Sequence, residues 1–231
     1  MKVLVACEES QEVCKAFRRL GHEAYSCDLQ ECSGGHPEWH IVGNALMLIH
    51  PECKSFTTMD GITHTHTNWD MLIAHPPCTY LSNVATRHYS LRCTPPEKVV
   101  ARWEERAKAA VFFMYFYCAN IPMVCIENPV GFMNAACRKP DQIIHPYMFA
   151  DSEEDTEQYV TKATCLWLRG LPKLKTNNLP KPDNGKLFGY HPTGKPRDWE
   201  SAVARGSKAR SKTFPGIAKA MAEQWGGDCN G

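Results

Sequence analysis

Four short apolar segments, each followed at once by a polar turn, constrain the fold of this chain more than any other feature. They are residues 2–7, 22–27, 70–74 and 122–126. Each has the length and apolar character of a buried strand. A helical spacing of apolar residues separates the first two segments, and a longer one covers residues 97–120 before the last. Strands that alternate with helices predict a mostly parallel sheet with helices on both faces.

The ends of these strands predict where a ligand binds. In open α/β sheets ligands bind at the carboxyl ends of the strands, so the turns after residues 6, 27, 74 and 126 are expected to share one edge. The opening strand, helix and second strand end at Asp28, and an acidic residue there suits a bond to a ribose hydroxyl. The turn at residues 6–11 has no glycine, although such units commonly carry a glycine-rich loop. Ser10 is predicted to cap the first helix.

The C-terminal third differs in composition from the rest of the chain. Residues 140–212 are rich in Pro, Lys and Gly, with one clear strand at 164–168, and a final helix follows at 215–225. Residues 162–212 hold 12 Lys and Arg against 3 Asp and Glu, whereas residues 1–161 hold 13 against 20. This contrast predicts contact with a polyanion, although a solvated surface loop has the same composition.

Bulk composition predicts a cytoplasmic globular protein. The 231 residues are 43% hydrophobic and 22% charged, enough for one substantial core. No apolar run approaches the roughly 20 residues that span a bilayer, so we expect no membrane contact. The apolar stretch at the N-terminus is too short for a secretory signal.

The twelve cysteines are spread along the chain. In a reducing compartment those in apolar runs, Cys7, Cys118 and Cys125, are expected to be small buried hydrophobes and not disulfide partners. A second group has spacings that a zinc site uses, but no second Cys-x-x-Cys pair supports it, so we expect no metal. That group is Cys27, Cys32, His36 and His40.

Two strand ends carry residues suited to covalent chemistry. Cys78 ends the run His75-Pro76-Pro77-Cys78, where the prolines rigidify the exit from the strand. Such a cysteine is either a turn residue or, where a neighbouring charge lowers its pKa, a thiolate nucleophile. Glu127 and Asn128 follow another strand, where a carboxylate can act as a general acid or as a helix cap. Together they suit addition of a thiolate to carbon 6 of cytosine, protonation of ring nitrogen 3, and methylation of carbon 5.

These segments resemble the cytosine-5 methyltransferase family, in particular its short phage and prophage relatives. Residues 74–82 resemble the nucleophile loop, and residues 126–130 resemble the Glu-Asn-Val motif that supplies the acid. Residues 3–11 occupy the place of the methyl-donor loop, with Asp28 as the ribose-binding acid, and residues 210–218 resemble the closing motif. The segments follow the family's order over nearly the whole chain.

The resemblance implies an α/β fold: a Rossmann-like class I methyltransferase sheet with helices on both faces and a small loop-rich C-terminal insertion. Residues 1–139 and 209–231 would form the catalytic domain, and residues 140–208 a short basic insertion for target recognition. It implies a catalytic set of Cys78, Glu127 and Asn128. It implies that S-adenosylmethionine is bound by Ala6, Cys7, Glu8, Ser10, Asp28, Asn44 and Pro76. It implies that DNA is contacted by Lys162, Arg169, Arg197, Lys208, Arg210 and Lys212.

Three departures from the family pattern keep two other functions open. The donor loop lacks the family's glycines, Ala163 stands where an arginine of a Gln-x-Arg motif is expected, and the recognition region is short. One alternative is a relative that binds nucleic acid without turnover. The other is a methyltransferase that acts on a free cytosine nucleotide.

Overall fold

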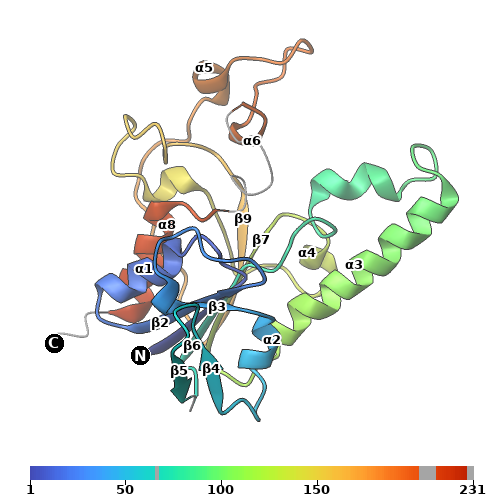
Figure 1. Cartoon of the computed structure of the whole chain (residues 1–231). Helices are drawn as coiled ribbons and strands as arrows, with labels where there is room; N and C mark the ends of the chain where they lie inside the picture. Colours follow the sequence, from blue (N-terminus) through green and yellow to red (C-terminus); the bar gives the residue numbers. More distant parts are fainter. Residues whose placement is uncertain (66–67, 203–211, 228–231) are drawn as a thin grey trace.

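The computed structural model describes residues 1–65, 68–202 and 212–227. A seven-stranded sheet, in the order β3-β2-β1-β6-β7-β9-β8, lies between helices on its two faces (Figure 1). Its strands are β1 (Lys2–Ala6), β2 (Glu23–Asp28), β3 (His40–Val42), β6 (Met71–Ala74), β7 (Met123–Pro129), β8 (Gln142–Ile144) and β9 (Thr164–Arg169). The strands β4 (Ser55–Thr57) and β5 (Thr63–Thr65) form a separate antiparallel hairpin. The predicted α/β class with a mostly parallel sheet is confirmed.

The helices alternate with the strands along the chain. The α-helices are α1 (Glu12–Arg19), α2 (Ala45–Leu48), α3 (Pro96–Tyr117), α4 (Met133–Ala136), α5 (Asn184–Phe188), α6 (Trp199–Ala202) and α8 (Pro215–Met221). Short 3-10 helices lie at η1 (Pro37–Trp39), η2 (Asn83–Tyr89) and η3 (Pro146–Phe149), and a π turn, η4 (Ala222–Gly226), extends α8. In the part of the chain that the structure describes, no helix combines the length and the apolar character that crossing a membrane requires.

Alternate residues of the central strands enter two separate cores. Val3 and Val5 of β1 face α1 and α8 in one core, whereas Leu4 faces Phe113 and Phe116 of α3 in the other. Successive side chains of a strand point to opposite faces. Because both faces are covered, the strands are continuous apolar runs, which made them recognisable in the sequence.

Two strands of the central sheet come from the range that we predicted to be an insertion. β9 runs antiparallel to β7, and β8 pairs with its outer side. The division at residue 139 therefore does not follow the sheet, and the lobe outside it begins after Arg169. We define this lobe as residues 170–202, which include α5 and α6. The apolar run of β9 requires this position, because Trp167 is fully buried against Phe113.

Helix α3 extends well beyond the sheet, and η2 lies beside its far end (Figure 1). We call residues 83–106, which include η2 and the first half of α3, the arm. Arg106 holds it together: its Nε donates to the carbonyl of Tyr80 at 2.9 Å, and its guanidinium lies over the Tyr89 ring. The broad apolar face predicted for this helix is only partly buried, because Val100 and Trp103 lie on the projecting part and remain exposed.

Candidate active site

The sheet register places the four polar turns side by side. Ala6 is paired with Cys27 and Ala74, and Ala74 is paired with Ile126. The next residue of each strand therefore lies at the same edge. We call these residues, Cys7, Asp28, His75 and Glu127, the strand-end edge. The four positions share one edge as predicted, but Glu127 and Asn128 lie in β7 and not in a turn, because β7 continues to Pro129 in its pairing with β9.

Asn128 fastens the Pro-Pro-Cys loop to β7. Its side-chain amide is buried and donates a hydrogen bond of 2.7 Å to the carbonyl oxygen of Pro76. Pro76 and Pro77 have no backbone N–H, so the loop has few donors of its own with which to pair. The hydrogen bond from the Asn128 amide connects the loop to β7. It thereby fixes the start of the loop that carries Cys78.

A second link between the two loops needs a glycine. Ser82 and Gly131 form an isolated β-bridge, and the amide of Phe132 donates to the carbonyl of Leu81 at 2.7 Å. A Cβ atom on Gly131 would overlap that same carbonyl oxygen. The close approach of the two backbones thus depends on glycine at this position.

Cys78 differs from the cysteines of the strands in its exposure. Burial raises the pKa of Cys27 to about 12 and raises the pKa of Cys7 and Cys125 above the ordinary value, so these thiols stay protonated. Cys118 also proves exposed, at the end of α3, so its predicted burial is wrong. The cysteines that the structure describes form no disulfide.

His75 and Glu127 form a buried ion pair on the strand-end edge. Their Nδ1 and Oε2 atoms are 2.7 Å apart, and the side chains are 10% and 17% exposed. Burial alone would raise the pKa of Glu127, but the hydrogen bond and charge of His75 and the charge of Lys162 lower it overall. Burial opposes the charge on His75, but Glu127 and Glu8 raise its pKa overall. These directions favour an imidazolium paired with a carboxylate, and they disfavour the protonated form of Glu127 that a general acid requires.

Lys162 lies near this pair, and not in the lobe. Its Nζ is 5.7 Å from the ring centres of both Trp199 and Phe214. Its charge contributes to lowering the pKa of Glu127. We predicted a DNA contact for Lys162, with Ala163 in the place of a family arginine. In the structure Lys162, the residue before Ala163, supplies a positive charge that acts on Glu127.

The turn at residues 6–11 adopts a left-handed backbone at two positions although it contains no glycine. Cys7 and Gln11 have φ angles of 61° and 60°, a left-handed conformation that costs other residues about 1–3 kcal/mol. The buried Gln11 side chain holds this shape, because its Nε2 donates to the His36 carbonyl at 2.9 Å and to Ser26 Oγ at 3.2 Å. Gly34 packs on the loop so closely that a Cβ there would lie 2.6 Å from the Gln11 Cβ.

Glu8, and not Ser10, satisfies the first turn of α1. Its two carboxylate oxygens accept from the amides of Val13 at 2.6 Å and Cys14 at 3.2 Å. The predicted Ser10 cap is wrong because Gln11, in its left-handed conformation, is the residue that precedes the helix and makes no side-chain cap. Ser10 is buried beneath the loop. The carboxylate of Glu8 is therefore committed to α1.

Asp28 is the last residue of β2, and Asn44 follows β3. The Oδ1 of Asp28 accepts from the Gln30 amide at 2.9 Å, and no described residue bonds its Oδ2. Asn44 caps α2 by accepting from the Leu46 amide at 3.0 Å. Asp28 thus keeps an acceptor for a ligand at the strand-end edge, whereas the oxygen of Asn44 is already bonded.

Arg169 does not lie where a DNA contact near Cys78 would require it. It pairs with Val124 in the sheet register, at the opposite end of β7 from Glu127. Its guanidinium donates to the carbonyls of Ala119 and Ile121, the latter at 2.9 Å. The predicted DNA contact is corrected to a structural anchor, because the antiparallel direction of β9 carries its end away from the strand-end edge.

The other predicted DNA-binding residues have three different settings. Arg197 is exposed in the lobe. Lys212 pairs with Glu12 at 3.1 Å, which brings the closing motif beside the start of α1. Lys208 and Arg210 lie outside the described residues.

The spacing that suggested zinc does not bring its residues together. His40 is buried, with Nδ1 bonded to Ser26 Oγ at 2.8 Å and Nε2 to the Gln30 carbonyl at 2.9 Å. Within residues 1–65, 68–202 and 212–227, no group of three or more His, Cys, Asp or Glu could hold a metal ion.

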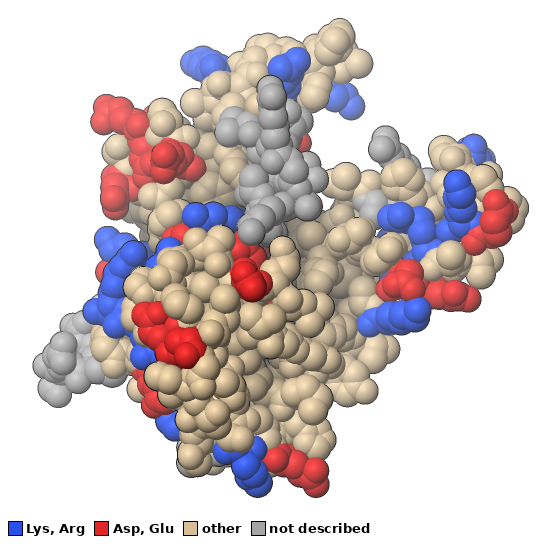
Figure 2. Space-filling model, in the orientation of Figure 1, with Lys and Arg blue, Asp and Glu red and all other residues tan. Residues whose placement is uncertain are grey.

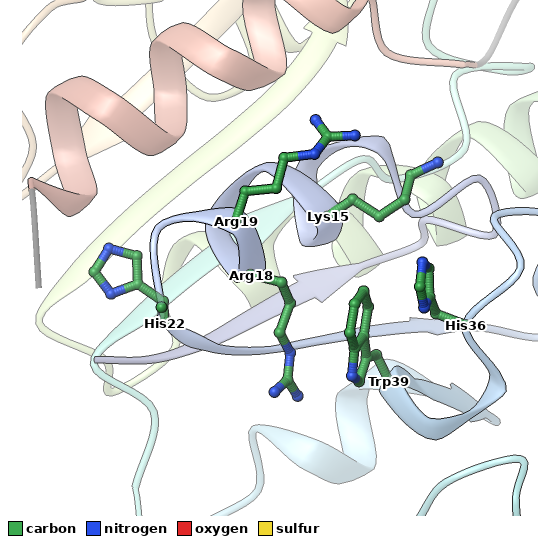
Figure 3. A pocket seen from close by; sticks show the side chains of 7 residues that line it. Lys15, Arg18, Arg19, His22, His36 and Trp39 are labelled. Atoms are coloured by element: carbon green, nitrogen blue, oxygen red, sulfur yellow. The ribbon is translucent and has the colours of Figure 1, made fainter.

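A separate basic hollow of about 420 Å³ lies against α1, away from the strand-end edge (Figure 3). It is lined by Lys15, Arg18, Arg19, Gly21, His22, His36 and Trp39. The imidazole of His36 stacks on the Trp39 ring, with 3.8 Å between the ring centres. Arg18 Nε donates to the carbonyl of Ala24 in β2. None of the lining residues belongs to the strand-end edge.

Comparisons with known proteins assign no family. Neither a scan against protein-family models nor a search of curated proteins finds a match to this chain.

Proposed function

We propose that this chain is a methyltransferase that uses S-adenosylmethionine to methylate carbon 5 of cytosine in DNA, with Cys78 as the covalent nucleophile. One observation carries the proposal: the bond from Asn128 to Pro76 joins the loop of an exposed cysteine to the strand that carries Glu127. A thiol and a carboxylate are thereby presented from neighbouring strand ends, where open α/β sheets bind their ligands.

The sheet supports the class of enzyme. β9 is antiparallel and lies between β7 and β8. The reversed β9 sets this sheet apart from the mostly parallel dinucleotide-binding sheet. The finer fold assignment, like the function, remains our proposal.

The residues at the ends of β1 and β2 fit the methyl donor. S-adenosylmethionine, when bound, supplies the methyl group. The Oδ2 of Asp28 suits a ribose hydroxyl, and the left-handed turn at Cys7 lies beside it at the end of β1. Because its carboxylate caps α1, Glu8 has only its backbone left for this role.

The residues at the ends of β6 and β7 fit the reacting base. The Cys78 thiolate forms a bond to carbon 6, and the displaced electron pair is neutralised when ring nitrogen 3 takes up a proton. Carbon 5 then accepts the methyl group, loses its proton, and the bond between sulfur and carbon 6 breaks. The ionised Glu127 can accept from the exocyclic amino group of cytosine, which uracil and thymine lack.

The arm and the lobe suit a large substrate. Figure 2 shows Lys and Arg on the lobe of α5 and α6, Lys and Arg together with Asp and Glu on the arm, and a gap between the two. The Pro-Pro-Cys loop leads directly into the arm, and Arg197 is exposed on the lobe. Basic groups on the lobe and on the arm favour a duplex held by its phosphates, from which the target base is flipped out.

Transfer of labelled methyl groups tests the proposal. The protein is incubated with labelled S-adenosylmethionine and either duplex DNA or dCMP, and Cys78→Ala and Cys93→Ser are compared. Cys93 is the matched control because it is also exposed but lies in the arm. We expect label in DNA with the wild type and Cys93→Ser, and none with Cys78→Ala.

Each of the other functions has its own outcome. Label confined to dCMP would favour a nucleotide methyltransferase. Tight DNA binding without calorimetric binding of S-adenosylmethionine would favour a binding protein without turnover. Either result contradicts the proposal.

A further inference from the structure

The proposed reaction needs a proton that Glu127 does not carry. As negative charge moves from the thiolate into the ring, nitrogen 3 must take up a proton. The lowered pKa of Glu127 keeps this side chain a carboxylate at neutral pH. His75 Nδ1 lies 2.7 Å from its Oε2, and the hydrogen bond and charge of Glu127 favour a proton on that imidazole.

His75 is largely buried, with 10% of its side chain exposed. Its Nε2 is buried, and no described residue bonds it. Three charged groups from three elements face the imidazole: Glu127 on β7, Glu8 after β1 and Lys162 before β9. The charges of Glu127 and Glu8 favour the imidazolium and that of Lys162 opposes it, while burial raises the pKa of Glu8 itself.

We propose that His75 stores the proton and, acting through Glu127, supplies it to ring nitrogen 3 of the bound cytosine. This inference rests on the proposed function. It makes His75 a positioning residue for Glu127 in the resting protein and the source of the proton during thiolate addition.

The step balances in atoms and charge. Before it, Cys78 is a thiolate, Glu127 a carboxylate and His75 an imidazolium. The sulfur forms its bond to carbon 6, the electron pair moves to nitrogen 3, and one proton leaves Nδ1 while one proton reaches nitrogen 3 by way of the carboxyl group. Afterwards His75 is neutral, Glu127 is again a carboxylate, and the ring carries no net charge. Expulsion of the thiolate returns the proton.

Lys162 keeps the stored proton from being trapped on Glu127. Its charge disfavours a proton on either partner. Lys162 therefore contributes to lowering the pKa of Glu127, and it partly offsets the rise in the pKa of His75. For Glu127 this maintains the carboxylate between turnovers, and for His75 it makes the proton easier to release. The ammonium at residue 162 thus tunes the pair without touching the base.

Two measurements test the proton store. The first is a titration of the histidine side chains by NMR in the free protein. We expect His75 to titrate above its ordinary pKa of 6.5 and to shift down in Glu127→Gln. Glu38→Gln is the control, because Glu38 pairs with His36 at 2.9 Å on the surface and should leave His75 unchanged. A His75 that is neutral at pH 6, or that ignores Glu127→Gln, overturns the proposal.

The second measurement is the pH dependence of methyl transfer in a single turnover. The wild-type rate should rise as Cys78 ionises and then fall as His75 loses its proton. His75→Asn keeps an N–H for Glu127 but cannot titrate, so it should be slower by about 10²–10⁴-fold and lack the falling limb. If His75→Asn does not fold, His75→Gln replaces it.

The outcomes separate the two proposals. An active wild type with His75→Asn equally fast and with an unchanged pH profile overturns the proton store alone. A wild type that transfers no methyl group at any pH overturns the proposed function, and the proton store fails with it even if the titration finds the pair.

Discussion

The side-chain amide of Asn128 donates a buried hydrogen bond of 2.7 Å to the carbonyl oxygen of Pro76. This bond connects two segments that are 52 residues apart in sequence and that end neighbouring parallel strands. It fixes the loop of Cys78 relative to Glu127, and the chemistry proposed here depends on that spacing.

Removing this bond should impair the reaction more than the fold. Asn128→Ala leaves a buried carbonyl unpaired, which costs about 1–3 kcal/mol of unfolding free energy. It also frees the nucleophile loop, and a misplacement of about 1 Å lowers catalytic rates by about 10²-fold. The measurements are chemical denaturation and the single-turnover methylation rate.

Asn177→Ala is the matched control for that variant. Asn177 also uses its side-chain amide to bond carbonyls, those of Tyr147 and Ala150, but far from Cys78 in the fold. Because Asn177 is exposed whereas Asn128 is buried, Asn177→Ala should lose less stability and keep the wild-type rate. Equal rate losses in both variants would argue against a specific role for Asn128.

Gly131→Ala should push the backbone after β7 away from the backbone at Leu81 and Ser82. The added methyl group would overlap the carbonyl oxygen of Leu81, a backbone atom that cannot move alone. We expect a loss of about 1–3 kcal/mol in unfolding free energy, typical of overpacking, and a marked fall in methylation. Gly43→Ala meets no atom within 4 Å and should change neither. A Gly131→Ala protein that is as stable as wild type would contradict the close approach.

The central strands were predictable because they are buried on both faces. Leu4 and Leu72 lie in runs so apolar that no other element fits, and Cys78 and Glu127 stood out because polar residues follow such runs. The position of β9 was not predictable, because pairing of Glu127 with Leu166 is a long-range choice between open sheet edges. Local patterns contain no information about it.

The side-chain hydrogen bonds at the site could not be predicted from the sequence either. His75 was visible only as a neighbour of two prolines, and its bond to Glu127 depends on the directions of two distant side chains. Ser10 fits the sequence pattern of a helix cap, but the left-handed backbone of Gln11 gives that role to Glu8. Arg169 looked like a DNA contact because only its charge, and not the direction of its strand, could be read.

The ion pair of His75 and Glu127 should give a stability maximum at mildly acid pH. Glu127 has a lowered pKa, so its contribution is complete above the ordinary value of 4.5 and is lost as the pH falls through the folded value. His75 has a raised pKa, so its contribution is complete below 6.5 and is lost as the pH rises through the folded value.

Comparison with Glu127→Gln isolates this effect from other titrating groups. The unfolding free energy of the wild type minus that of the variant should be largest between about pH 4.5 and 6.5, at about 1–3 kcal/mol, and smaller on both sides. A difference that grows steadily towards acid pH would instead indicate a protonated Glu127 and contradict the pair.

Arg197 and Arg169 should separate DNA binding from stability. Arg197 is exposed in the lobe, so Arg197→Ala should reduce the salt dependence of DNA binding by about one phosphate contact, measured by fluorescence anisotropy. Arg169→Ala should leave the salt dependence unchanged and lower the melting temperature, because it removes bonds to Ala119 and Ile121. The reverse pattern would contradict the assignment of the lobe.

A covalent complex with duplex DNA that contains 5-fluorocytosine tests the central claim most directly. Fluorine at carbon 5 cannot leave as a proton does, so the enzyme stays bound to the methylated base. With S-adenosylmethionine, the wild type and Cys93→Ser should each give a complex that survives denaturation, with the DNA mapped to Cys78 by mass spectrometry. Cys78→Ser should give none. A complex that persists in Cys78→Ser, or the failure of the folded wild type to form one, would contradict Cys78 as the nucleophile.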